Sequence, residues 1–197
     1  MKNISYVDDE FAKLKTELIN GKIVMMSPRP RINHAKVCFN IGIAFGQYLK
    51  GKKCEAFGDG VDVYLDDKNR FIPDVMIVCN PDIIKPDAIY GAPDLVVEVL
   101  SHSTEKNDRT KKKLAYEQAG VKEYWLVDTW GKSVEVYLNH NRHFELDEIY
   151  RLVSDEEKRE NDKLADEENR KIIIHDEIKV SLYDDLYVKL TDIFDRI

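Results

Sequence analysis

Short apolar segments separated by turn sequences run through most of the chain. The pair Asn20-Gly21 favours a tight hairpin, because both residues readily adopt positive φ, and apolar residues flank it on both sides. Residues 61–65 alternate between apolar and polar side chains, which is the pattern of a strand with one buried face. The predicted strands are 17–19, 23–26, 61–65, 71–78, 94–100, 124–127 and 134–138, with shorter strands at 171–175 and 178–182.

Two longer segments have helical periodicity. Apolar residues recur every three or four positions over residues 33–50, with Asn33 as the expected N-cap. A second helix is predicted over residues 108–119 and ends at Gly120, and a short one is expected over 190–197. Together these elements predict an α/β fold, in which a mixed sheet of about six or more strands is packed against helices.

The length and composition fit one domain that spans residues 1–197. Apolar residues make up 43% of the chain, which is enough to build a core. The 30 basic and 37 acidic residues give a net charge of -7, which argues against nucleic-acid binding through bulk positive charge. Residues 145–170 hold eleven of the acids and five of the basic residues, so we expect an acidic segment at the periphery.

Several protein classes are disfavoured by the sequence. Apolar runs are too short to span a bilayer, and the N-terminus lacks the apolar stretch of a signal peptide. The cysteines Cys38, Cys54 and Cys79 are odd in number and far apart, which favours neither a disulfide framework nor a zinc site. We therefore expect a cytoplasmic protein without a membrane partner.

Acidic residues inside apolar strands are the most informative feature of the sequence. Glu98 lies in an almost continuous apolar strand, where Val96 and Leu100 are its neighbours on the same face. Asp74 repeats the pattern in the preceding apolar run. Burial of an unpaired carboxylate costs on the order of several kcal/mol, so each acid must be paired, protonated or bound to a cation, and two such acids suggest a shared site. The alternative is that each acid ends its strand in solvent or meets a buried arginine.

The helix predicted over residues 108–119 carries a lysine on its inner face. Asp108, Lys112 and Tyr116 recur at intervals of four residues and therefore share that face. A lysine placed there can reach the carboxylate of Glu98 on the strand just before the helix. The alternative is a solvated basic helix start, the usual meaning of such a run, although basic residues are electrostatically unfavourable at a helix N-terminus.

A series of motifs follows a fixed order between about residue 15 and residue 195. They are residues 17–21, Met26-Ser27-Pro28, His34, Pro73-Asp74, GAPDLVVEVLS at 91–101, Ser103-Thr104, Asp108 with Lys112 and Tyr116, and GVKEYWLVD at 120–128. In this order and spacing the chain resembles the bacterial "putative restriction endonuclease" family, formerly a domain of unknown function. That family belongs to the PD-(D/E)XK nuclease superfamily.

The resemblance implies a restriction-endonuclease-like core, a mixed β-sheet flanked by helices, with a divalent-metal site. By position, Asp74 is the acid of the Pro-Asp half-motif and Glu98 is the acid of the second half. Both would bind Mg²⁺ or Mn²⁺ through carboxylate oxygens. The superfamily pattern has a lysine two residues after the second acid, where this chain has Leu100. The match places the lysine at Lys112 instead, the residue that the helical phase selects independently.

Four further residues are auxiliary candidates. His34 is a candidate acid/base or phosphate contact, and is equally well explained as a helix-start histidine with a structural hydrogen bond. Glu17 would add a carboxylate. Asp108 is as consistent with a helix cap or a partner of Lys112 as with a metal ligand. Tyr116 is expected to pack in the core while its hydroxyl group bonds a site residue.

We therefore predict a metal-dependent endonuclease that hydrolyses DNA, with RNA as an alternative substrate and a homodimer expected by analogy with nucleases that cut two strands. Asp74 and Glu98 would hold the metal, and Lys112 would orient water or stabilise developing charge. The alternative, motivated by Leu100, is a non-catalytic nucleic-acid-binding or protein-interaction module. Residues 106–113 carry five basic residues and one acid, so weak, salt-sensitive DNA binding is expected despite the net charge.

Overall fold

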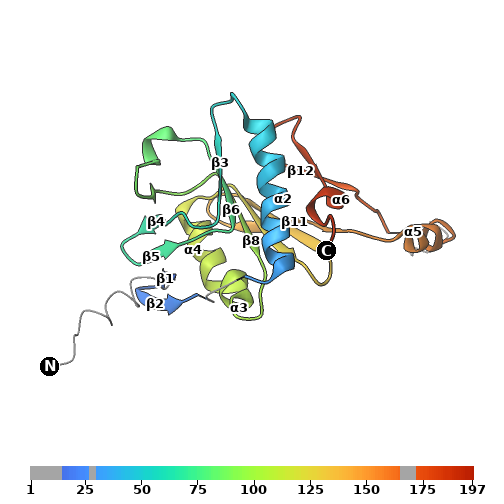
Figure 1. Ribbon diagram of the computed structural model, residues 1–197, viewed down its shortest axis with the longest axis horizontal. Coiled ribbons are helices and arrows are strands. Elements are labelled where there is room, and N and C mark those ends of the chain that lie inside the picture. The colour runs from blue at the N-terminus through green and yellow to red at the C-terminus, as the bar shows by residue number, and fades with distance from the viewer. Residues whose placement is uncertain (1–14, 27–29, 165–171) are drawn as a thin grey trace.

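Two large β-sheets and a small two-stranded sheet, with helices packed on them, form the α/β fold of the computed structural model, which describes residues 15–26, 30–164 and 172–197 (Figure 1). The larger sheet has six strands in the order β11-β10-β9-β8-β6-β3, and the smaller has five in the order β2-β1-β5-β4-β7. The strands of the larger sheet are β3 (Glu55–Gly58), β6 (Val75–Val78), β8 (Leu95–Val99), β9 (Glu123–Asp128), β10 (Ser133–Asn139) and β11 (Phe144–Arg151). Those of the smaller sheet are β1 (Thr16–Ile19), β2 (Lys22–Met25), β4 (Val63–Asp66), β5 (Asn69–Phe71) and β7 (Ile89–Tyr90).

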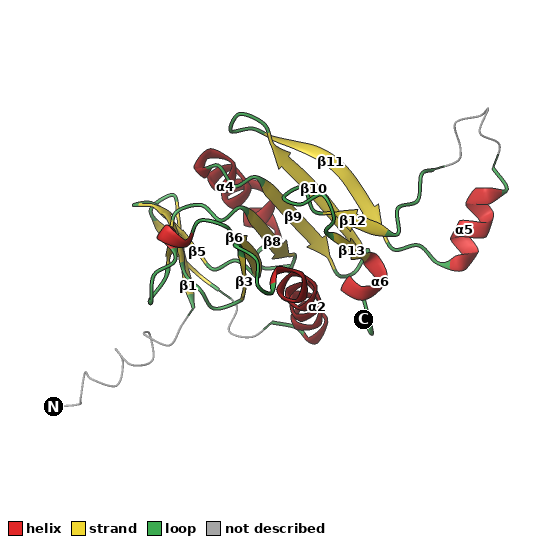
Figure 2. Ribbon diagram, turned by 90° about the horizontal axis from the view of Figure 1, so that it is seen from above, coloured by secondary structure: helices red, strands yellow, loops and turns green. Residues whose placement is uncertain are grey.

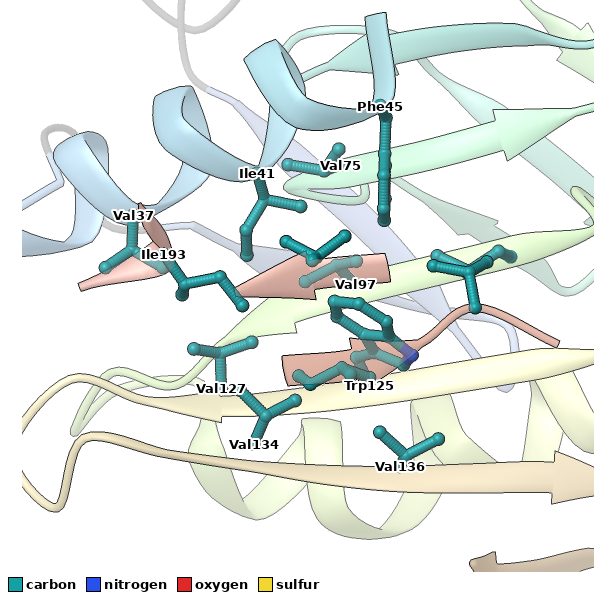
Figure 3. Close-up of a cluster of buried hydrophobic side chains, with 14 of the residues drawn as sticks. Val37, Ile41, Phe45, Val75, Val97, Trp125, Val127, Val134, Val136 and Ile193 are labelled. Carbon is teal, nitrogen blue, oxygen red and sulfur yellow. The ribbon is translucent and has the colours of Figure 1, made fainter. Parts of the chain in front are cut away.

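The six-stranded sheet buries both of its faces. Helix α2 (Ile32–Leu49) covers one face together with the C-terminal elements β12 (Glu177–Lys179), β13 (Tyr187–Lys189) and α6 (Leu190–Ile193), as Figures 2 and 3 show. The five-stranded sheet and α4 (Lys113–Ala119) cover the other face. Alternate residues of β8 therefore enter different cores, with Val97 on the α2 side and Val96 on the α4 side. Such burial on both faces explains the nearly continuous apolar sequence of β8.

The apolar run 71–78 is two strands and not one. β5 ends at Phe71 in the five-stranded sheet, and β6 starts at Val75 in the six-stranded sheet. Pro73 lies between them, and proline has no N–H to donate to a strand ladder. The chain thus crosses from one sheet to the other at Pro73-Asp74, and this crossing positions Asp74 between the two sheets.

The first long helix begins two residues earlier than predicted, because its N-cap is Arg31 rather than Asn33. Arg31 is the last residue with extended backbone angles, so Asn33 already lies inside the first turn and does not cap it. The predicted inner face is otherwise confirmed, because Val37, Ile41 and Phe45 are fully buried.

The helix predicted over 108–119 starts earlier, at α3 (Glu105–Asn107), and continues through a π-helical turn, η2 (Asp108–Lys112), into α4. It ends at Gly120, as predicted, where the backbone is left-handed with φ 93°. A π-helical turn widens the helix locally and often occurs at functional sites. Here both ends of the turn, Asp108 and Lys112, are buried.

The acidic segment 145–170 contains a strand that the sequence pattern did not reveal. β11 runs from Phe144 to Arg151 at the edge of the large sheet, and its register with β10 shifts between Val136 and Tyr137. That irregularity breaks the two-residue alternation from which strands are recognised. The mostly exposed helix α5 (Asp155–Asp162) follows and stands apart from the sheets (Figures 1 and 2).

Cys54 and Cys79 form a disulfide, contrary to the expectation from cysteine spacing. Cys54 precedes β3 and Cys79 follows β6, and the antiparallel register of these strands pairs Glu55 with Val78. The cysteines are the next pair in that register, with Cα atoms 4.0 Å apart. Strand pairing therefore brings together two cysteines that are 25 residues apart in the sequence.

The C-terminal region differs in detail from its prediction. Of the strands predicted at 171–175 and 178–182, the second overlaps β12, residues 172–175 are not in a strand, and residue 171 lies outside the described part. Helix α6 covers the first half of the predicted segment 190–197. None of the helices in the described ranges is both long and apolar enough to cross a bilayer.

A buried carboxylate attaches the C-terminal segment to the large sheet. Glu123 in β9 is fully buried, and its Oε1 accepts a hydrogen bond of 2.6 Å from Trp125 Nε1. Its Oε2 accepts hydrogen bonds from the Ser181 amide at 2.7 Å and from Ser181 Oγ at 2.5 Å. Burial raises the pKa of Glu123, and the bonds from Ser181 and Trp125 partly oppose this rise.

We expect Glu123→Gln to lower the free energy of unfolding by about 1–3 kcal/mol, because the glutamine amide would direct a donor at either Trp125 or Ser181 and leave a buried group unpaired. Denaturant titration measures the change. Glu145→Gln, an exposed substitution of the same type on β11, serves as the control. Equal stability of the two variants would contradict the structural role of Glu123.

Candidate active site

A pocket of about 650 Å³ opens beside the start of α2 and the end of β8. Three of the predicted site residues, Asp74, Glu98 and Lys112, line it together with His34. Its volume is within the range of about 300–1,000 Å³ that is typical of ligand sites. Glu17, Asp108 and Tyr116 lie behind these residues and contact them, as described next.

Strand pairing brings the two acids together. In the antiparallel pair of β6 and β8, Val75 lies opposite Val97, and one step further in the same register Asp74 lies opposite Glu98. Asp74 Oδ2 accepts a hydrogen bond of 2.7 Å from the Val99 amide. Both acids are nearly inaccessible, with exposed fractions of 9% for Asp74 and 3% for Glu98.

Lys112 is the centre of the buried charge cluster. Its Nζ lies 2.8 Å from Glu98 Oε1, 3.0 Å from Glu17 Oε1 and 3.2 Å from Asp108 Oδ1. The side chain is 2% exposed. One ammonium group therefore contacts three carboxylates that come from β1, β8 and η2.

Burial and neighbouring charges shift the pKa values of Glu98 and Lys112. Burial raises the pKa of Glu98 well above its ordinary value, although Lys112 opposes this rise. Burial lowers the pKa of Lys112, but the negative charges of Glu98 and Asp108 raise it by more, so that this pKa lies well above its usual value. The upward shift of this pKa favours the charged ammonium form of Lys112 next to the carboxylates.

The remaining polar contacts orient the cluster. Tyr116 donates a hydrogen bond of 2.8 Å to Glu98 Oε1, and Ile72 N donates one of 3.1 Å to Glu17 Oε1. Tyr124 donates to the Asp108 carbonyl oxygen at 2.9 Å. Asp108 is inside the helix and pairs with Lys112, and it is not a helix cap.

His34 connects Asp74 to a third, unexpected residue. Its Nε2 lies 3.3 Å from Asp74 Oδ2, and its Nδ1 lies 3.4 Å from Cys38 Sγ. Burial lowers the pKa of His34, but the hydrogen bond and charge of Asp74 raise it by more, so the net shift is upward. The contacts give His34 a partner on each ring nitrogen.

Two overlapping donor sets include Asp74. Ligand atoms of His34, Cys38 and Asp74 lie within 4.8 Å of one another, which is close enough to hold a metal ion. Burial, however, raises the pKa of the Cys38 thiol far above its ordinary value, and metals bind the thiolate. The set of Asp74 and Glu98 supplies only carboxylate oxygens, which are the ligands of hard cations such as Mg²⁺.

The charge balance of the cluster fits a divalent cation. Four carboxylates, those of Glu17, Asp74, Glu98 and Asp108, share the site with Lys112 and with His34. Asp108 Oδ1 is buried and lies 3.2 Å from Lys112 Nζ, and no further partner of this atom is present in the described part of the chain. In the described part of the chain, the hydrogen bonds and ion pairs of Asp74 and Glu98 use Oδ2 and Oε1, so that Oδ1 and Oε2 have no such partner there.

Cys38, His102 and Trp130 are residues at the site that the sequence pattern did not predict. Of these three residues, only Cys38 had a signal in the sequence, which is its spacing from His34. His34 and Cys38 are four residues apart on one helix, and Trp130 follows a strand that runs parallel to the Glu98 strand. Nothing in the sequence showed that the turn carrying Trp130 reaches the same pocket.

We expect Lys112→Met to lower the free energy of unfolding by about 3–5 kcal/mol in metal-free buffer, because it leaves three buried carboxylates without their common partner. Thermal and denaturant unfolding measure this loss, with the exposed neighbour substitution Lys111→Met as the control. Added Mn²⁺ should restore part of the stability of Lys112→Met. A stability equal to that of the control would show that the cluster does not depend on Lys112.

Comparison with known proteins gives consistent results. The Uma2 family, described as "Putative restriction endonuclease", matches residues 6–166. The uncharacterized protein slr1290 of Synechocystis sp. is 30% identical over 131 residues, which cover 66% of this chain and 68% of that protein.

A solved structure has the same fold. It is the crystal structure of a "putative nuclease belonging to DUF820" from Anabaena variabilis, with a TM-score of 0.65 and 22% identity, and the match covers 94% of this chain and 96% of that one. The similarity supports the nuclease-like α/β fold that the strand order and helix positions describe. Because the family model matches most of its length, the chain belongs to the Uma2 "Putative restriction endonuclease" family.

Proposed function

We propose that this protein is a metal-dependent endonuclease that hydrolyses DNA phosphodiester bonds at the pocket beside Asp74 and Glu98. The observation that carries the proposal is that Asp74, Glu98 and Lys112 line one pocket, while Glu17 and Asp108 contact Lys112 from behind it. Several carboxyl groups share one ammonium group there, and a bound divalent cation would favour their ionised form. Asp74 and Glu98 are the proposed ligands, and Mg²⁺, or Mn²⁺ in its place, is the proposed ion.

The residues of the chain have separate roles in this proposal. A bound Mg²⁺ would polarise the scissile phosphate and lower the pKa of a coordinated water. The Val99 amide and His34 orient Asp74, while Tyr116 orients Glu98. Lys112 holds a fixed positive charge at Glu98, where negative charge grows on the phosphate during hydrolysis.

His34 and Glu17 have supporting roles in this scheme. His34 lies against Asp74 at the pocket wall, where it could contact the phosphate or transfer a proton. Glu17 does not line the pocket and contacts Lys112 from behind, so we assign it to holding Lys112 in place rather than to the metal.

DNA is the proposed substrate because the family is named for restriction endonucleases, and RNA is the second polymer to test. In the basic stretch 106–113, Lys106 and Lys111 are exposed and would attract the phosphate backbone, whereas Lys112 is buried and Arg109 pairs with glutamates. A homodimer and a cytoplasmic location stay predictions from the sequence. Light scattering in solution tests the first.

We expect the purified protein to cut DNA in the presence of Mg²⁺ or Mn²⁺, and Asp74→Asn or Glu98→Gln to slow cutting by about 10²-fold or more, because each removes a charged metal ligand. A gel assay with supercoiled and linear DNA measures the rates. Asp67→Asn and Glu145→Gln are matched controls at exposed positions. Equal cutting by all four variants, with their folding checked by circular dichroism, would rule out this site.

A second expectation concerns the metal alone. Calorimetry should detect one or more Mn²⁺ ions bound by the wild-type protein, and Glu98→Gln should weaken that binding, because only the charged form attracts the ion. Bound Mn²⁺ should also raise the melting temperature, since a ligand that binds only the folded state stabilises it. A protein that binds DNA but no divalent ion would instead be the non-catalytic module.

A further inference from the structure

Two aromatic rings stand at the pocket that contains the proposed catalytic acids. His102 and Trp130 both line it, with ring centroids 4.6 Å apart and an angle of 31° between the ring planes. Trp130 is 51% exposed. The other tryptophan of the chain, Trp125, is fully buried and packs edge-on against Phe45 in the core under α2 (Figure 3).

The sheet topology explains why these rings and the acids share one pocket. β8 and β9 are parallel neighbours in which Val99 pairs with Val127, so the loops that follow them leave at the same edge. His102 lies in the loop after β8, four residues beyond Glu98, and Trp130 lies in the turn after β9. The edge at the carboxyl ends of parallel strands is where open α/β sheets bind ligands.

Local hydrogen bonding holds Trp130 in this position. The Trp130 amide donates a hydrogen bond of 2.9 Å to Asp128 Oδ1, which closes the turn between β9 and β10. A turn of this kind needs the aspartate but does not need an aromatic residue after it. Leaving half of a tryptophan side chain exposed to water is unfavourable. Packing within the described part of the chain therefore does not explain why a tryptophan occupies this position.

The chemistry around the rings indicates what would cover them. The same pocket is lined by the acids Asp74 and Glu98 and by the basic residues Lys15 and Arg31, of which Lys15 pairs with Asp59. A ligand that fits all of these groups combines a flat aromatic group with phosphate. A nucleotide has both parts, and a base stacked on an aromatic side chain is a common mode of binding single-stranded nucleic acid.

We propose that Trp130, supported by His102, is a stacking platform for one unpaired nucleobase next to the phosphate that is cut. This inference rests on the proposed nuclease function and narrows its substrate. A base inside a duplex is stacked on both faces and paired along one edge. Its face therefore reaches Trp130 only from a single strand or after extrusion from the duplex. Trp130 is thus a specificity-determining residue, and the acids remain the proposed metal ligands.

Tryptophan fluorescence tests the stacking directly, because the chain has two tryptophans and only Trp130 is exposed. The probes are a 12-nucleotide single strand, the 12-base-pair duplex, and that duplex with one mismatched pair. Each is titrated into Glu98→Gln protein without added divalent metal, so that cutting does not interfere with the measurement. We expect the single strand to quench the emission, and Trp130→Phe, which keeps only Trp125, to lose the quenching.

Affinity measured by fluorescence anisotropy separates stacking from a structural role. Trp130→Ala should weaken single-strand binding by about 5- to 150-fold, whereas Trp130→Phe keeps an aromatic plane and should bind within a few-fold of the parent. Quenching by the mismatched duplex would identify extrusion as the route, and quenching by the single strand alone would identify a single-strand substrate. Equal affinity of the Ala and Phe variants for every probe would overturn the proposal.

The outcome is distinguishable from failure of the nuclease function. Cutting by the wild-type protein without quenching at Trp130 would overturn the platform and leave the nuclease. Quenching and loss of affinity in Trp130→Ala, with no cutting under any metal, would support the platform and overturn the nuclease.

Discussion

The contact of Lys112 with three buried carboxylates is the interaction on which the arrangement of the site depends. Its ammonium group meets Glu17 from the five-stranded sheet, Glu98 from the six-stranded sheet and Asp108 from the π-helical turn before α4. Charges out of water are tolerated only when they are compensated, so these three elements are held at a fixed separation. The pocket is built on this fixed frame.

The frame also explains the position of Asp74. The chain must leave the five-stranded sheet after β5 and join the six-stranded sheet at β6, and Pro73 is where it does so. Asp74 is thereby directed at the end of β8, where the Val99 amide and His34 hold it beside Glu98. Asp74 lies between two strands and not within one, and its hydrogen bond with the Val99 amide fixes the position of its side chain.

Sequence patterns were informative where a residue's environment follows from its near neighbours. The alternation around Glu98 and the four-residue spacing of Asp108, Lys112 and Tyr116 both depend on a local repeat, and the structure has these residues on the inner sides of their elements. The same patterns failed where neighbours in space decide. The Cys54–Cys79 disulfide depends on the pairing of β3 with β6, and the edge strand β11 is obscured by a register shift.

The sequence by itself determined which charged residues would be buried. An acid in an apolar strand or a lysine on an apolar helix face is costly in free energy, and it stands out in the hydrophobic pattern. The sequence also determined the family, through motifs spread over most of the chain. Only the tertiary structure decided that Glu17 meets Lys112 and that Trp130 shares a pocket with Glu98, 32 positions earlier in the chain. Those contacts arise from sheet order and parallel pairing, which act between distant segments and leave no periodic trace in either one.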